Sequence, residues 1–101
     1  MPNQTYYQRC QSLLRAIDAL STLGVVVRQV QIDANPPVVW VFPNTALYRA
    51  QGVKLGKIAD LGCNQDVRTK VCGCHGCEVR WLETHSFIRA RQAMQADGGR
   101  P

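Results

Sequence analysis

The chain begins with an amphipathic helical pattern. Apolar residues recur at alternating spacings of four and three, which places them on one face of an α-helix. This stripe consists of Tyr6, Cys10, Leu13, Leu14, Ile17 and Leu20. Asn3 or Thr5 can cap the start, and Gly24 can end the helix in a left-handed conformation. Because Cys10 lies on the stripe, we expect it to be a small core residue.

Two β-rich segments follow this helix. The segments "VVVRQVQID" (residues 25–33) and "VVWVF" (residues 38–42) are separated by "NPP". Prolines cannot donate ladder hydrogen bonds, so they belong in the turn, and the pattern predicts strand, turn, strand. Side chains alternate along a strand, so Val38, Trp40 and Phe42 share one face. We expect Trp40 to be a core residue.

The segment from residue 44 to residue 66 has the least regular pattern. Asn44 or Thr45 can cap a short helix that Gly52 ends. Further glycines then predict loops, with a short strand around residues 53–55.

A second hairpin is predicted around the turn "HG". An X-Gly pair between β-rich flanks suits a type I′ turn, which needs positive φ at both positions. The turn sets a register in which Cys74 faces Cys77. By alternation, one face of this hairpin then collects Cys72, Cys74, Cys77, Val79 and Trp81.

The last segment, "THSFIRARQAMQA", is predicted to be a helix capped by Thr84. Residues 97–101 are expected to fray. The whole pattern predicts one α+β domain over residues 1–96. Its antiparallel sheet has about four strands in two hairpins, and N-terminal and C-terminal helices flank it.

Composition adds the class of protein and its compartment. The chain has 101 residues, 46% of them hydrophobic, which predicts one globular domain. Its formal net charge of +5 excludes an acidic nucleic-acid mimic and permits contact with nucleic acid or an acidic protein. The start lacks a basic region followed by an apolar one, and no apolar run is long enough to span a membrane. We therefore expect a protein of the reducing cytoplasm that binds no membrane.

The clustered cysteines support two interpretations. Cysteine is among the most buried residue types, so the cluster can be part of the core. Alternatively, Cys74 and Cys77 form a C-x-x-C pair that Cys63, with Cys72 or His75, completes as a tetrahedral zinc site. The cofactor prediction is therefore none, or one structural zinc held by Cys63, Cys72, Cys74 and Cys77.

Catalytic motifs are absent from the sequence. There is no G-x-x-x-x-G-K-[ST] and no G-x-S-x-G, and the seven acidic residues form no recognisable catalytic pair. A reactive C-x-x-C thiol is typically placed at a helix N-terminus, whereas this pair flanks a hairpin turn. The sequence therefore indicates a protein that is not an enzyme.

Three short stretches, "GVVVRQVQID", "PPVVWV" and "HGCEVRW", carry a resemblance. In this combination the chain resembles small accessory proteins encoded by phages and prophages of proteobacteria, over roughly residues 12 to 82. The matching residues are strand and turn residues, and Cys72 and Cys74 depart from the pattern. The resemblance implies an accessory role in a bacterial host cell: host take-over, transcriptional control, or inhibition of a defence system such as CRISPR–Cas.

These observations favour a small binding protein that sterically blocks a host protein or nucleoprotein complex. The alternative is a zinc-stabilised regulator that binds nucleic acid through its Arg and Lys residues. A third possibility is a purely structural or assembly subunit, which would self-associate, for example as a homodimer. The candidate partner-binding residues are Tyr48, Arg49, Lys54, Lys57, Arg80, Arg89 and Arg91.

Overall fold

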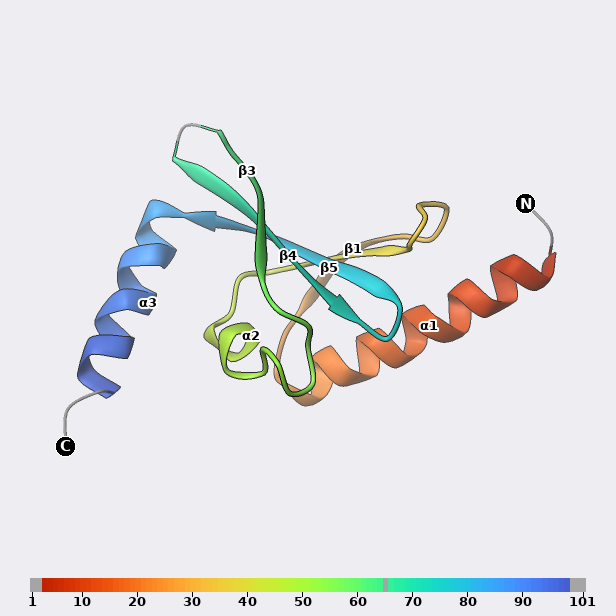
Figure 1. Ribbon diagram of the computed structural model, residues 1–101, viewed down its shortest axis with the longest axis horizontal. Helices are drawn as coiled ribbons and strands as arrows, with labels where there is room; N and C mark the ends of the chain where they lie inside the picture. Colours follow the sequence, from red (N-terminus) through yellow and green to blue (C-terminus); the bar gives the residue numbers. More distant parts are fainter. Residues whose placement is uncertain (1–2, 65, 99–101) are drawn as a thin grey trace.

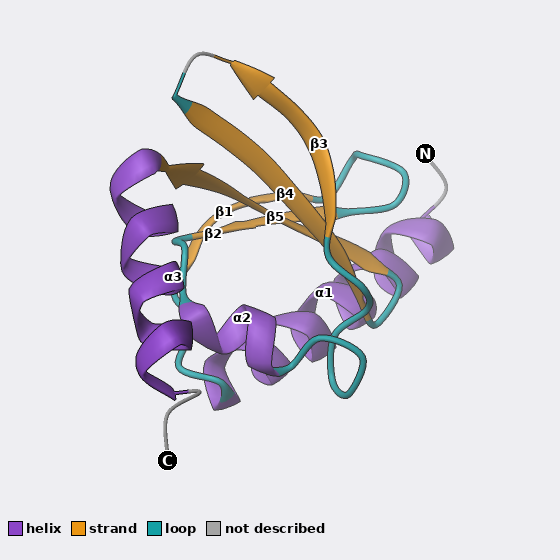
Figure 2. Ribbon diagram, turned by 60° about the vertical axis from the view of Figure 1, so that its left-hand side comes forward, coloured by secondary structure: helices purple, strands orange, loops and turns teal. Residues whose placement is uncertain are grey.

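The computed structural model describes residues 3–64 and 66–98. Within these residues the chain forms one five-stranded sheet and three helices, and all three helices lie on the same side of the sheet (Figure 2). In chain order the elements are α1 (Asn3–Thr22), β1 (Val27–Gln31), β2 (Val38–Val41), α2 (Thr45–Arg49), β3 (Ala59–Asn64), β4 (Val67–Cys74), β5 (Cys77–Thr84) and α3 (His85–Gly98). The predicted α+β class is confirmed.

The sheet is mixed, which corrects the prediction of about four antiparallel strands. The strand order is β1-β2-β5-β4-β3, and β2 runs parallel to β5 while every other pair is antiparallel. Adjacent antiparallel strands need only a short turn, but a parallel pair needs a long crossover. Here the chain between β2 and β5 includes α2, β3 and β4, which supplies that crossover (Figure 1).

The fifth strand is the second correction. β3 pairs antiparallel with β4 in the segment that we expected to be loop. Residues 53–54 instead lie in a turn, and Leu55 forms an isolated bridge with Gln51 and not the predicted short strand. The sequence of β3, "ADLGCN", has few β-formers, and all six of its residues are exposed. It is a strand because β4 is eight residues long and presents an otherwise open edge to it.

The β4–β5 hairpin has the predicted register. Cys74 faces Cys77 and Cys72 faces Val79. His75 has a φ of 50° and Gly76 has a φ of 80°. Both angles are positive, as a type I′ turn requires.

The core lies between the sheet and the helices. Its largest side chain, Trp81, is completely buried, and Val39 and Val41 come from the neighbouring strand β2. Trp40 was expected in the core, but it is only half-buried, and the guanidinium carbon of Arg80 lies 5.9 Å from the centre of its ring. The segment "VVWV" is apolar on both faces, so a period of two does not identify the buried face.

Only part of the predicted stripe of α1 is buried. Leu13 and Leu20 pack into the core together with Ala16. Cys10 is exposed, so the expectation that it is a core residue is wrong. The reason is that Cys10 lies on the same side of α1 as Leu14, which is 64% exposed, and away from the face of Leu13, Ala16 and Leu20 that meets the core.

Three helix ends follow the predicted capping pattern, whereas Asn3 and Thr5, the predicted caps at the start of α1, both lie within the helix. α1 ends before Gly24, which has a φ of 78°. The side chain of Asn44 accepts a hydrogen bond from the N–H of Ala46 at 2.9 Å, so Asn44 caps α2. Thr84 accepts a hydrogen bond from the N–H of Phe87 at 3.3 Å and caps α3.

α3 continues to Gly98, two residues into the segment that was predicted to fray, and residues 99–101 lie outside the described residues. None of the helices in residues 3–64 and 66–98 combines the length and the apolar character that crossing a bilayer demands.

Candidate functional site

The hairpin cysteines lie in the core. Cys72, Cys74 and Cys77 are buried on the helix-facing side of the sheet, in the same cluster as Val79 and Trp81. Burial raises the pKa of all three thiols, that of Cys72 to about 12. A thiol with a raised pKa is a poor nucleophile, so this arrangement favours packing over thiol chemistry.

The structure does not bring the fourth predicted zinc ligand to the other three. Cys63 is exposed on β3 and faces Arg68, four residues before Cys72 on the next strand. At a rise of about 3.3 Å per residue, this offset is about 13 Å along the sheet. The other predicted ligand, His75, is exposed at the turn.

Residues 3–64 and 66–98 contain no group of three or more His, Cys, Asp or Glu side chains placed to hold a metal ion. Zinc binding stays a prediction that elemental analysis tests.

A buried carboxylate lies at the other end of β5. Glu83 is 0% exposed, and its Oε2 accepts a hydrogen bond from Trp81 Nε1 at 2.8 Å and another from the hydroxyl of Tyr48. Nη2 of Arg91 lies 3.8 Å from Glu83 Oε1. The four side chains come from α2, β5 and α3, so we call them the Glu83 cluster.

The aromatic rings complete this cluster. The rings of Tyr48 and Trp81 meet edge to face, with centroids 6.2 Å apart. The guanidinium carbon of Arg91 lies 4.0 Å from the centre of the Tyr48 ring, a cation–π contact. Burial and the adjacent Glu83 carboxylate raise the pKa of Tyr48 well above its ordinary value, so Tyr48 stays a hydrogen-bond donor.

The Glu83 cluster joins the two later helices to the sheet. Among the described residues, Glu83 Oε1 and Arg91 Nε are buried without a hydrogen-bond partner, so the ion pair is incompletely satisfied. A buried carboxylate needs its countercharge, so Arg91 holds α3 against β5. Tyr48 and Arg91, both predicted to bind a partner, thus contribute to this internal cluster, and partner binding through them stays a prediction.

The sequence contained a signal for this cluster. Alternation along β5 places Glu83 on the same face as Cys77, Val79 and Trp81, and this face is buried throughout the strand. A carboxylate in register with a core face indicates a buried, partnered acid. Its partners on α2 and α3 are distant in the chain, and only the fold identifies them.

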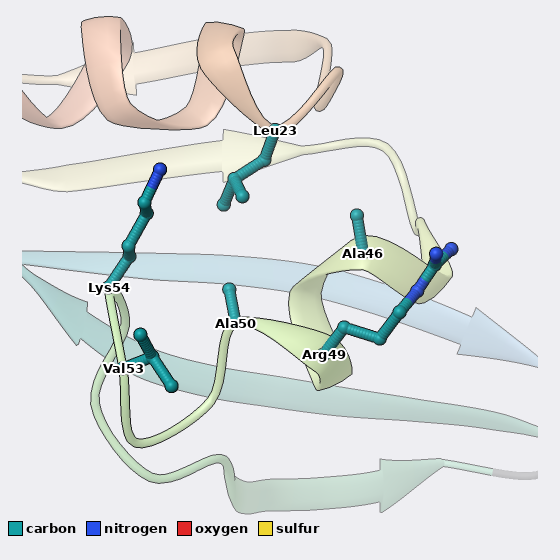
Figure 3. A pocket seen from close by; sticks show the side chains of 6 residues that line it. All are labelled: Leu23, Ala46, Arg49, Ala50, Val53 and Lys54. Atoms are coloured by element: carbon teal, nitrogen blue, oxygen red, sulfur yellow. The ribbon is translucent and has the colours of Figure 1, made fainter.

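A shallow groove opens between the end of α1, α2 and the loop that follows it (Figure 3). Its floor is apolar and consists of Leu23, Ala46 and Ala50. Arg49 and Lys54 lie on opposite sides of this floor, and both are exposed. The remaining lining residue, Val53, is 82% exposed. We call this feature the α2 groove.

The surroundings of the α2 groove are basic. The chain contains no Asp or Glu from residue 34 to residue 59, while Arg49, Lys54 and Lys57 all lie in this segment and are exposed. The structure brings Arg49 and Lys54 to one groove, as the partner-binding prediction needs.

The other predicted cations lie elsewhere. Arg80 is half-buried on the sheet face that no helix covers in the described chain, and its Nε donates a hydrogen bond to Glu78 Oε2 at 2.9 Å. Arg89 is exposed on α3, near Arg68 and His85.

Comparison of the chain with protein-family models, with curated proteins and with solved structures finds no match.

Proposed function

We propose that this protein is a non-enzymatic binding protein that captures an acidic segment of a partner protein in the α2 groove. The most concrete version is a phage or mobile-element protein that sterically blocks a host defence complex of the CRISPR–Cas type. The observation that carries the binding site is the combination of an apolar floor with a cation on either side of it.

The chemistry of the groove specifies its occupant. Val53 leaves most of its side chain in water beside Leu23 and the two alanines, so an apolar side chain of a partner would bury additional apolar area there. Arg49 donates a hydrogen bond to Thr45 Oγ1 at 3.1 Å, which orients its guanidinium at the rim. Carboxylates on both sides of an apolar anchor would complement Arg49 and Lys54, and such pairs at a rim set specificity and association rate.

A protein partner fits the groove better than nucleic acid does. Single-stranded nucleic acid is bound through aromatic side chains on which bases stack, together with cations for the phosphates. Tyr48 is the aromatic residue of α2, but its hydroxyl is bonded to Glu83 and Arg91 covers its ring. The apolar floor offers nothing to a phosphate backbone.

The proposal is tested with labelled 12-residue peptides in which a Leu or Phe is flanked by Asp and Glu, and with matched peptides that carry Lys instead. We expect the acidic peptides to bind the wild-type protein and the basic ones not to bind. The double variant Arg49→Glu/Lys54→Glu should lose this binding at least tenfold, whereas the control Arg15→Glu/Arg28→Glu, with the same charge change elsewhere, should keep it. An equal loss of affinity in both double variants would show that net charge alone attracts the peptides, and it would overturn the proposal that they bind in the α2 groove.

Plain DNA and RNA duplexes provide the second arm of the test. Binding that falls steeply with salt would favour the nucleic-acid regulator instead.

An infection assay tests the defence-system version. A host that carries a CRISPR–Cas system against a phage should be infected efficiently when it expresses the wild-type protein. It should resist the phage when it expresses Arg49→Glu/Lys54→Glu.

A further inference from the structure

α1 carries more apolar side chains than the core receives. Besides the buried residues, a second stripe runs along the helix and consists of Tyr7, Cys10, Leu14 and Ile17. Tyr7 is 65% exposed and Leu14 is 64% exposed, and Cys10 between them is exposed as well. Ile17 at the end of the stripe is half-buried, so the stripe is a continuous apolar surface of which Tyr7, Cys10 and Leu14 are exposed to water.

The half of the helix that bears the start of this stripe has little support from its own chain. None of residues 3–12 is buried, although Arg9 donates a hydrogen bond to the carbonyl of Ile32 at 3.2 Å. An isolated helical segment of about ten residues is only marginally stable in water. A partner along the exposed stripe would supply the burial that stabilises this segment.

The spacing of the stripe defines the partner. Tyr7, Cys10, Leu14 and Ile17 follow one another at three, four and three residues, which is the spacing of a coiled-coil seam. This pattern reads the same in both directions along the helix. We propose that α1 pairs antiparallel with α1 of a second copy of this chain, with Cys10 opposite Leu14 and Tyr7 opposite Ile17 of that copy.

Antiparallel pairing agrees with the polar residues beside the stripe. Gln4, Gln11 and Asp18 border it on the exposed side. In the antiparallel register Asp18 of one copy lies near Gln4 of the other, and Gln11 lies near its own counterpart. No like charges meet, and amides can hydrogen-bond to the carboxylate and to each other.

The position of the folded body also favours this direction. Every buried residue of α1 lies between Leu13 and Leu20, so the body of each copy sits at the C-terminal half of its helix. Antiparallel pairing places the weakly supported N-terminal half of each helix beside the body of the other copy. Parallel pairing would set the two bodies side by side and leave both N-terminal halves without that cover.

The oligomeric state tests the pairing. One helix pair is smaller than a standard interface, so we expect a dimer with a micromolar Kd, seen by sedimentation velocity between about 1 and 100 μM. Leu14→Glu should abolish the concentration dependence. Gln8→Glu, the same added charge on another face of the exposed half, should leave it unchanged. A wild-type chain that is monomeric throughout, or a Leu14→Glu variant that still dimerises, would overturn the proposal.

Disulfide trapping tests the register, in a Cys63→Ser background that removes the other exposed cysteine. Diamide takes two electrons and two protons from a pair of thiols and leaves a disulfide. The variant Leu14→Cys should form covalent dimers quickly, because position 14 then lies opposite Cys10 of the second copy. The background chain with Cys10 alone should do so slowly. Rapid trapping through Cys10 alone would mean parallel pairing and refute the antiparallel register.

Discussion

Replacing Arg91 with methionine would remove the countercharge of a fully buried carboxylate. Methionine keeps the length and much of the apolar stem of arginine, so the change is mainly electrostatic. Glu83 would keep its hydrogen bonds from Tyr48 and Trp81, but no cation would remain within ion-pair distance of its Oε1 among the described residues. We expect a large loss of stability and a loosened α3.

The geometry sets the magnitude. Arg91 Nη2 and Glu83 Oε1 lie 3.8 Å apart. At this separation, and with an effective dielectric constant of about 20, the Coulomb attraction is about 4 kcal/mol. Part of this lost attraction is offset, because burying a charged guanidinium costs desolvation free energy and burying a methionine does not. We therefore expect Arg91→Met to lower the free energy of unfolding by about 3 kcal/mol, a large part of the stability of a small domain.

Urea unfolding followed by tryptophan fluorescence measures this loss, since Trp81 belongs to the cluster. Arg89→Met on the same helix is the control, because Arg89 is exposed, and it should change stability by less than about 0.5 kcal/mol. In a double-mutant cycle, Glu83→Gln should recover at least about 1 kcal/mol in the Arg91→Met background. If Arg91→Met and Arg89→Met behaved alike, the ion pair would not stabilise the fold.

Three further outcomes follow from the structure. Cys72 has its pKa raised from 9.0 to about 12, and those of Cys74 and Cys77 are also raised, so the folded chain keeps protons that the unfolded chain releases. The stability that Cys72 contributes is complete below about pH 9 and is lost as the pH rises toward about 12, by up to about 1.4 kcal/mol per pH unit, and Cys74 and Cys77 change stability in the same direction. Urea unfolding under reductant at several pH values measures this loss. A stability that stays flat up to about pH 10 would contradict the burial of these thiols. Gly56→Ala would place a Cβ 3.2 Å from a backbone nitrogen of β4, whereas the Cβ of Gly62→Ala would meet nothing within 4 Å. We expect Gly56→Ala to lose about 1 to 3 kcal/mol and Gly62→Ala to have little effect in the same assay. If the cysteines are core residues, elemental analysis of protein purified without chelator should find no zinc and Cys74→Ser/Cys77→Ser should be destabilised; one zinc per chain, lost in that variant, would establish a metal site instead.

The local elements of this fold were accessible from the pattern of residues. Capping at Asn44 and Thr84, the end of α1 before Gly24 and the register of the hairpin about His75 each depend on a few neighbouring residues. Hydrogen bonds to a cap and positive φ in a turn are short-range constraints, so a single segment contains the information.

The candidate site was predicted less completely. Arg49 and Lys54 were recognised as cations of one segment, but the apolar floor between them includes Leu23, which lies at the end of another helix. Glu83 was not recognised as a buried residue although alternation along β5 places it on the core face, and its partners Tyr48 and Arg91 come from two other elements. A site assembled from separate segments exists only once the chain has packed.

By itself the sequence determined the α+β class, the caps of α2 and α3, the end of α1, the β4–β5 hairpin and the shared face of its three cysteines, because these follow from side-chain periodicity and local backbone geometry. Only the tertiary structure decided that β2 runs parallel to β5, that the weak segment Ala59–Asn64 is a strand, that Cys10 faces water, and that Glu83 meets Tyr48 and Arg91. These outcomes depend on which surfaces are left to cover when distant segments meet. Strand pairing and burial are properties of the packed chain, and periodicity alone cannot say which of two apolar faces the core will take.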